Sequence, residues 1–243
     1  MMILLTQFSR EAAFWKSAKA CARRGFTMTE LVVVIAIVVV LVSLLFPLLN
    51  TAQTRMKETR CANNLRVLGT AFRLFAAEHD NRLPMSYVIG SDTPDNNWWY
   101  RLSSYAGVKM NADWYSIGTL SMRDPYHCPD VKYPDAKIGG NAWVSYKMNE
   151  QFRRVLETTR GGGNPVGDMG FPLSIITNPE EILLLAEGRK HCEFNTPETN
   201  DIAWGLWYPH GGRMNGLFVD GHVEAMAYAQ LKARWDDCFW VVP

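Results

Sequence analysis

Nineteen consecutive residues without a charge, Leu31 to Leu49, constrain this chain more than any other feature of its sequence. About 20 apolar residues span the hydrocarbon core of a bilayer, whereas strands rarely exceed about 10 residues. In lipid, a helix satisfies all of its own backbone polar groups. The run therefore predicts a transmembrane helix, and a buried helix of a soluble protein is the alternative.

Basic residues flank the run unevenly. Arg23 and Arg24 lie close to its N-terminal end, whereas Arg55 and Lys57 begin six residues beyond Leu49. The positive-inside rule therefore favours a cytoplasmic N-terminus, with the bulk of the chain outside the cytoplasm. A cleaved secretory signal peptide is the alternative, but no Ala-x-Ala site follows the run. We expect the apolar segment to stay in the mature protein.

One acidic residue, Glu30, stands at the start of the apolar run. An ionised carboxylate in a bilayer costs at least a few kcal/mol, so an intramembrane Glu marks a functional site by default. A structural explanation is also open, because the macrodipole and interfacial water stabilise a carboxylate in the first turn of a helix.

The stretch RRGFTMTE, from Arg23 to Glu30, resembles the N-terminal signal of type IV pilins and type II secretion pseudopilins. The resemblance implies that a prepilin peptidase cuts between Gly25 and Phe26 and that Phe26 is then N-methylated. Pro47 stands where the family commonly has a helix-softening proline. The resemblance also implies that Glu30 pairs with the new amine of a neighbouring subunit, which cancels two charges that are costly apart.

A second set of motifs follows through the rest of the chain. They are CANNL at 61–65, LP at 83–84, HCPD at 127–130, SYKMN at 145–149, LAE at 185–187 and HGGRMNGLFVDGHV at 210–223. The last has a His followed after nine residues by Asp-Gly, and the set resembles the H-x9-DG subgroup of prepilin-type proteins, which is similar to the major pseudopilin of type II secretion. The resemblance marks His210, Asp220 and Gly221 as motif residues without defining their role.

The pattern predicts an α+β, pilin-like fold, in which a long N-terminal helix packs on a small antiparallel β-sheet. The helix is transmembrane in its first half and amphipathic in its second, where one apolar stripe contains Cys61, Leu65, Leu68, Phe72 and Phe75. Pro84 ends the helix around residues 80–82. We expect a leader over 1–25, a membrane and filament-core helix over 26–49, its amphipathic continuation over 50–82, and a periplasmic globular domain over 83–243, with the H-x9-DG motif at 210–221.

Within the globular domain, apolar segments predict strands over 143–148, 182–187 and 204–208. Two further strands, over 215–219 and 222–226, flank Asp220-Gly221, which predicts a hairpin with a two-residue type I′ turn. Residues 229–237 predict a short terminal helix.

Four cysteines remain after the expected cut: Cys61, Cys128, Cys192 and Cys238. In an oxidising periplasm they can form up to two disulfides, in three connectivities. We favour Cys61–Cys128, because this bridge would hold the loop-rich region that follows the long helix. Cys192–Cys238 is then left by elimination, and buried free cysteines are the alternative.

Potential metal ligands are present near the hairpin, namely His210, Asp220 and His222, with His191 and Glu187 elsewhere. A Gly-Gly bend after His210 could fold it back toward the other two. We favour the alternative, in which Asp220 serves the turn and His210 a local hydrogen bond. The sequence has no CxxC pair and no Asp-rich calcium loop, so we expect no metal and no cofactor.

No Ser/His/Asp or Cys/His arrangement singles out a nucleophile, and a formal net charge of +1 gives no reason to expect nucleic acid. We expect a non-enzymatic subunit in the bacterial inner membrane, processed by prepilin peptidase. It would assemble with itself and other pilin-like subunits into a type II secretion pseudopilus or a type IV pilus-like filament. The alternative is a membrane-tethered extracytoplasmic binding module, for example for glycans, because the chain has nine tryptophans. A hydrophobic core is the competing place for these rings.

Overall fold

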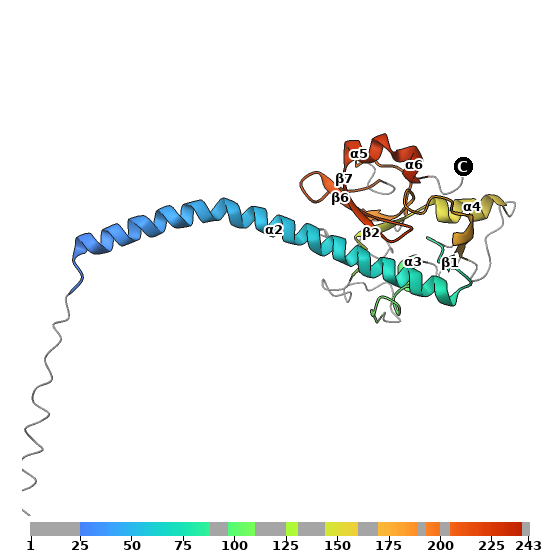
Figure 1. Cartoon of the computed structure of the whole chain (residues 1–243), viewed down its shortest axis with the longest axis horizontal. Coiled ribbons are helices and arrows are strands. Elements are labelled where there is room, and N and C mark those ends of the chain that lie inside the picture. Colours follow the sequence, from blue (N-terminus) through green and yellow to red (C-terminus); the bar gives the residue numbers. More distant parts are fainter. Residues whose placement is uncertain are drawn as a thin grey trace, which may run out of the picture. The chain divides into compact units, whose positions relative to one another are not determined.

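The computed structural model describes residues 25–87, 97–109, 125–130, 144–159, 170–188, 193–199 and 205–239. The chain divides into two compact units, Met1–Leu49 and Asn50–Pro243. Helix α2 (Met28–Glu78) contributes residues to both units (Figure 1).

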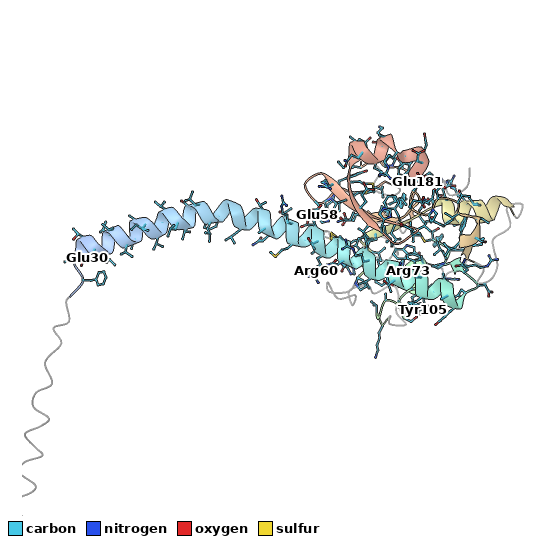
Figure 2. All side chains as sticks on the ribbon, in the orientation of Figure 1. Glu30, Glu58, Arg60, Arg73, Tyr105 and Glu181 are labelled. Carbon is cyan, nitrogen blue, oxygen red and sulfur yellow. A yellow bond between two sulfur atoms is a disulfide. The ribbon has the colours of Figure 1, made fainter. Side chains whose placement is uncertain are left out.

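In the first unit, α2 exposes apolar side chains on all sides, and Figure 2 shows them projecting from the ribbon. No residue in the most apolar 18-residue stretch of α2 is buried. Among the described residues, α2 is the one helix whose length and composition allow it to cross a membrane. A helix that is apolar on every side needs an apolar environment, either lipid or other helices.

In the second unit, the predicted apolar stripe of α2 is confirmed. Its five members, Cys61, Leu65, Leu68, Phe72 and Phe75, are each at most 4% exposed. They share one cluster of buried side chains with residues from three strands of the five-stranded sheet described below. The helical spacing of apolar residues therefore places the long helix against the sheet.

Helix α2 ends for a local reason other than Pro84. Asp80 and Asn81 have positive φ angles of 51° and 56°, and the Asn81 N–H donates to the Ala76 carbonyl at 2.9 Å. A left-handed end of this kind satisfies a carbonyl that the last turn leaves open, and Asp and Asn adopt it more readily than most residues. The chain has therefore left the helix before it reaches Pro84.

A mixed five-stranded sheet, in the order β5-β2-β4-β6-β7, forms the layer against the helix. Its strands are β2 (Tyr146–Asn149), β4 (Leu183–Glu187), β5 (Glu193–Phe194), β6 (Arg213–Phe218) and β7 (Val223–Ala227). The predicted α+β, pilin-like fold is confirmed, and its small sheet is antiparallel except at one edge. Strand β5 pairs parallel with β2, because the chain leaves β4 and returns on the far side of β2.

Other elements surround this sheet. Strands β1 (Arg82–Leu83) and β3 (Phe171–Pro172) form a separate antiparallel pair, and the short helices are α3 (Trp98–Arg101), α4 (Gln151–Thr159) and η4 (Leu173–Ile175). Of the strand predicted over 204–208, the described residues form only an isolated bridge between Leu206 and Gly188. The predicted terminal helix is divided into α5 (Tyr228–Ala233) and α6 (Trp235–Phe239).

The β6–β7 hairpin is present, but the type I′ turn predicted at Asp220-Gly221 is wrong. The Gly221 N–H donates to the Phe218 carbonyl at 2.9 Å, and Gly221, with φ of 94°, is the turn residue with positive φ. This is a three-residue loop with glycine at its left-handed position. The side chain of Asp220 accepts the His222 N–H at 3.0 Å, a local bond that is typical of Asp in turns.

Candidate functional site

Glu30 and Thr27 close the N-terminal end of α2. The N–H and the hydroxyl of Thr27 both lie 2.8 Å from Glu30 Oε2, and the Glu30 N–H lies 3.2 Å from Thr27 Oγ1. These reciprocal bonds are a capping box. Sequence reasoning missed this role for Glu30, although Thr-x-x-Glu before an apolar run is its signature. Figure 2 shows Glu30 at the first turn of the helix.

The residues just before the helix are sterically open. Gly25 and Phe26 precede α2 in non-helical conformation, and the Phe26 side chain is 78% exposed. No atom lies within 4 Å of the place where a Cβ on Gly25 would stand. The peptide bond between these two residues is therefore accessible, and a side chain at Gly25 would disturb no contact.

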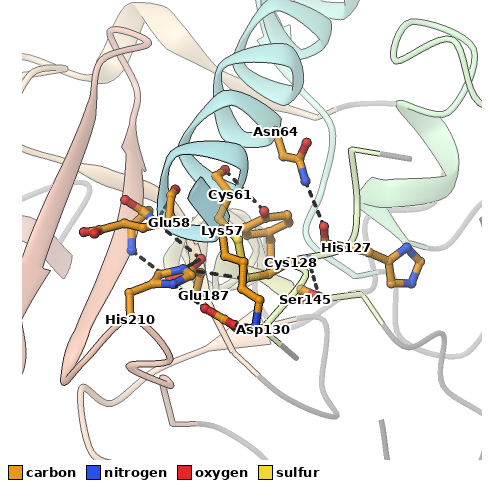
Figure 3. A network of polar contacts seen from close by, with 12 residues as sticks. Lys57, Glu58, Cys61, Asn64, His127, Cys128, Asp130, Ser145, Glu187 and His210 are labelled. Carbon is orange, nitrogen blue, oxygen red and sulfur yellow. Dashed lines mark hydrogen bonds and ion pairs between the residues drawn. A yellow bond between two sulfur atoms is a disulfide. The ribbon is translucent and has the colours of Figure 1, made fainter. Parts of the chain in front are cut away.

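His210 lies at the centre of a buried polar network in the second unit (Figure 3). Its Nε2 is 2.8 Å from Glu187 Oε1, and its Nδ1 is 2.9 Å from Asp130 Oδ2. Lys57 Nζ pairs with the other oxygen of Asp130 at 2.7 Å, and the Asn215 N–H donates to Glu187 Oε2 at 2.9 Å. One imidazole therefore links α2, β4, β6 and the loop that carries Asp130.

A tight turn places this imidazole. The His210 N–H donates to the Arg213 carbonyl at 3.0 Å, and the Arg213 N–H donates to the His210 carbonyl at 3.3 Å. Gly211 and Gly212 have φ angles of 63° and 85°, and a type I′ turn requires positive φ at both central residues. A side chain at either position would be strained, so the Gly-Gly pair fixes where β6 begins and where His210 lies.

Charge in the network is shared between His210 and Glu187. Burial lowers the pKa of His210, but the hydrogen bonds and negative charges of Glu187 and Asp130 outweigh it and raise that pKa overall. Burial raises the pKa of the Glu187 carboxyl, and the bond from His210 opposes this rise. The pKa values of His210 and Glu187 are both raised, which favours a state in which the pair retains a proton near neutral pH.

A disulfide lies beside the His210 imidazole. Cys61 of α2 is bonded to Cys128, with the two Cα atoms 5.1 Å apart, and Cys128 Sγ lies 3.6 Å from His210 Nε2. Asn64 Nδ2 donates to the His127 carbonyl at 2.8 Å and so holds the same loop to the helix. This is the pairing that the sequence favoured, and it fastens the loop to α2 next to the network.

The other expected disulfide, Cys192–Cys238, is wrong in this structure. Cys238 is a free, buried cysteine, packed with Leu231 and Phe239 in a second cluster of apolar side chains. Burial raises the pKa of its thiol, so Cys238 behaves as a small apolar residue. Cys192 lies outside the described residues.

Of the metal ligands considered from the sequence, the structure brings Glu187 to His210 but keeps Asp220 and His222 away from it. His210 precedes β6 and Asp220 follows it, and a strand of six residues separates its two ends by about 20 Å. Asp220 instead lies 2.7 Å from Nδ1 of the neighbouring His222, in an exposed pair. The structure places Glu187, and not Asp220, against His210, and His191 lies outside the described residues.

Two of the tryptophans considered for glycan binding are core residues. Trp98 is fully buried and Trp99 is 3% exposed. The Trp98 ring stacks on Phe72 of the long helix, with centroids 5.8 Å apart. Trp207 packs, partly buried, against the same cluster, and Trp204 lies outside the described residues. The Trp98 ring therefore stabilises the packing of α2 on the domain.

Comparison with known proteins identifies the N-terminal region. The family described as the prokaryotic N-terminal methylation motif matches residues 21–46. The type IV major pilin protein PilA of Myxococcus xanthus (strain DK1622) is 35% identical to this chain over 85 residues. The N-terminal region therefore carries a prepilin-type methylation motif, and part of the chain is similar to a type IV pilin.

The similarity to the pilin covers only part of each protein. The aligned residues are 35% of this chain and 39% of the Myxococcus pilin, well under half of that relative. The family match ends before the second unit begins. No solved structure matches the chain.

Proposed function

We propose that this chain is a pilin-type structural subunit. The part of α2 that belongs to the first unit would hold it in the inner membrane, and the same part would assemble it into a filament. One observation carries the proposal, namely an apolar helix with no buried face that carries the N-terminal methylation motif. Such a surface needs lipid or other helices around it. In a filament, the same helix from neighbouring copies would supply that environment.

We infer that Glu30 has two roles, capping the N-terminal end of α2 and pairing with a neighbouring subunit in the filament. Both bonds from Thr27 reach Oε2 of Glu30, so the capping box leaves Oε1 for a further donor. Cleavage by prepilin peptidase between Gly25 and Phe26 would create such a donor, the methylated amine of Phe26 in a neighbouring subunit. A carboxylate and an amine in lipid are each costly alone, so pairing them would set the register between subunits.

The disulfide is evidence for which side of the membrane the second unit lies on. Disulfides form and persist in oxidising compartments such as the bacterial periplasm. Cys61 and Cys128 both lie in the second unit, which we therefore place in the periplasm, with the N-terminus in the cytoplasm. The filament would be a type II secretion pseudopilus or a type IV pilus-like fibre, built with other pilin-like subunits and without an enzymatic role.

Gly25→Val should block processing. A Cβ at Gly25 would have no neighbouring atom within 4 Å, so the variant should fold and insert normally, whereas the peptidase would no longer find its glycine. Co-expression with a prepilin peptidase should shorten the wild-type chain on a gel by the leader of 25 residues and leave the variant at precursor length.

The control for this experiment is Phe26→Leu, which keeps an apolar residue after the cut and should still be shortened. A wild-type chain whose length is the same with and without the peptidase would refute the processing step.

Glu30→Gln should separate the two roles of Glu30. Glutamine also completes a capping box, so helix α2 should keep its N-terminal end. The negative charge that would pair with the Phe26 amine is lost. We expect normal processing and a decrease in sheared filaments of about tenfold or more, as is typical when one partner of a buried charge pair is removed. Filaments would be quantified by immunoblot of the sheared fraction.

Thr27→Val is the matched control, because it removes the hydroxyl from the cap and leaves the Glu30 charge in place. It should keep wild-type filament yield. If Thr27→Val loses filaments and Glu30→Gln keeps them, Glu30 acts through the cap alone.

A further inference from the structure

Four side chains that can bind a metal ion meet in the buried network of Figure 3, namely Cys61, Cys128, Glu187 and His210. One ligand atom from each lies within 4.8 Å of every other, and all four residues are buried. The absence of a CxxC pair from the sequence does not argue against this set, because the fold brings the two cysteines together across 67 residues.

Two neighbouring groups orient these ligands. Asp130 holds Nδ1 of His210 at 2.9 Å, which directs Nε2 toward Glu187 and Cys128. The Asn215 N–H holds Oε2 of Glu187, which directs Oε1 toward the same point. A carboxylate on the far nitrogen of a histidine is the usual support of a metal-binding imidazole.

We propose that, until the Cys61–Cys128 disulfide forms, these four side chains bind one zinc ion. Zinc prefers four tetrahedral ligands from Cys, His and carboxylate, and two thiolates select it over calcium or magnesium. Ligands of a tetrahedral zinc ion lie about 3.3 to 3.8 Å apart. The distances from Nε2 of His210 to Glu187 Oε1 and to Cys128 Sγ, 2.8 and 3.6 Å, need only small adjustments.

Zinc binding transfers no electrons. Two thiol protons and the Nε2 proton of His210 leave to solvent, and two Zn–S bonds, one Zn–N bond and one Zn–O bond form. Sulfurs joined in a disulfide have no thiolate to offer, so the disulfide and the zinc site exclude each other. The inference does not depend on filament assembly, because it concerns the thiol form of the second unit.

The test uses the full chain in detergent, with Cys21, Cys192 and Cys238 changed to alanine so that Cys61 and Cys128 are the two remaining cysteines. One sample is reduced with a phosphine and the other is left oxidised, and both are dialysed against zinc and then against buffer. Metal analysis should find about one zinc per reduced chain and almost none in the oxidised chain. Cobalt(II) in the reduced chain should give a thiolate charge-transfer band and the intense visible bands of a tetrahedral site.

Variants locate the site. Glu187→Gln should weaken zinc binding by about tenfold or more, whereas His222→Gln, which changes an exposed histidine outside the network, should leave it unchanged. The cobalt spectrum needs no variant, so the proposal stays testable if Glu187→Gln fails to fold. A reduced chain that retains no more zinc than the oxidised one, or a cobalt spectrum without a thiolate band, overturns the proposal.

Discussion

Replacing both Cys61 and Cys128 by alanine should lower the free energy of unfolding by about 4 kcal/mol. The disulfide closes a loop with a sequence separation of 67 residues, and loop-closure entropy in the unfolded chain gives a loss of this size. A domain of this size has a total stability of only about 5 to 15 kcal/mol, so the variant should lose a large share of it. Denaturant unfolding of the full chain in detergent, followed by tryptophan fluorescence, measures the change.

Reduction of the wild-type chain should reproduce the effect of the double variant, and a chelator in both samples keeps metal binding out of the comparison. Cys238→Ala is the matched control, because it removes a buried sulfur that forms no disulfide. It should cost roughly 1 kcal/mol or less. If the double variant and the Cys238 variant have equal stability, the bridge does not stabilise the domain.

His210→Gln should destabilise the second unit by about 3 to 5 kcal/mol, because it leaves the buried Glu187 carboxylate without its ion-pair partner. Glu187→Gln should act similarly. The double variant should lose less than the sum of the two single changes, since the second substitution removes a group that is already unpaired. Thermal or denaturant unfolding at fixed pH gives the three values.

The pH dependence supplies a second measurement. The folded pKa of His210 is raised, so the stability from its pairing is fully present below the unfolded pKa, about 6.5. This stability is lost as pH rises through the folded pKa. Wild-type stability should therefore fall above about pH 6.5, and this fall should be absent from His210→Gln.

His222→Gln is the matched control for both measurements, because His222 also pairs with a carboxylate, that of Asp220, but its side chain is 42% exposed. Exposed pairs contribute about 0 to 1 kcal/mol. Equal costs for His210→Gln and His222→Gln would contradict the importance of burial in the network.

The sequence predicted the parts of the fold that depend on local pattern. The stripe from Cys61 to Phe75 repeats at helical spacing, and each of its residues is buried because one face of α2 packs on the sheet. The β6–β7 hairpin follows from two apolar segments around Asp220-Gly221. The predicted turn type was wrong because Phe218 pairs with His222, which leaves three residues in the loop rather than two.

The His210 network could not be predicted from spacing. Its ion pairs join Lys57, Asp130, Glu187 and His210, which are distant in sequence and meet only when α2, β4 and two loops are packed. The Gly-Gly bend after His210 suggested that it could fold back toward Asp220, but strand β6 lies between the two residues and keeps them apart. The glycines after His210 did carry a usable signal, since Gly-Gly at a strand start is typical of a type I′ turn.

The Cys61–Cys128 bond has a mechanical consequence for a subunit that is pulled along its helix. A force entering the second unit through α2 reaches Cys61 and crosses directly to Cys128, so the covalent path bypasses every residue between them. The chain between them, with a sequence separation of 67, holds about 220 Å of extended length that tension cannot draw out while the bond is intact. Single-molecule stretching should therefore release that length only in the reduced protein, and the oxidised subunit should transmit tension as a shorter, stiffer tether.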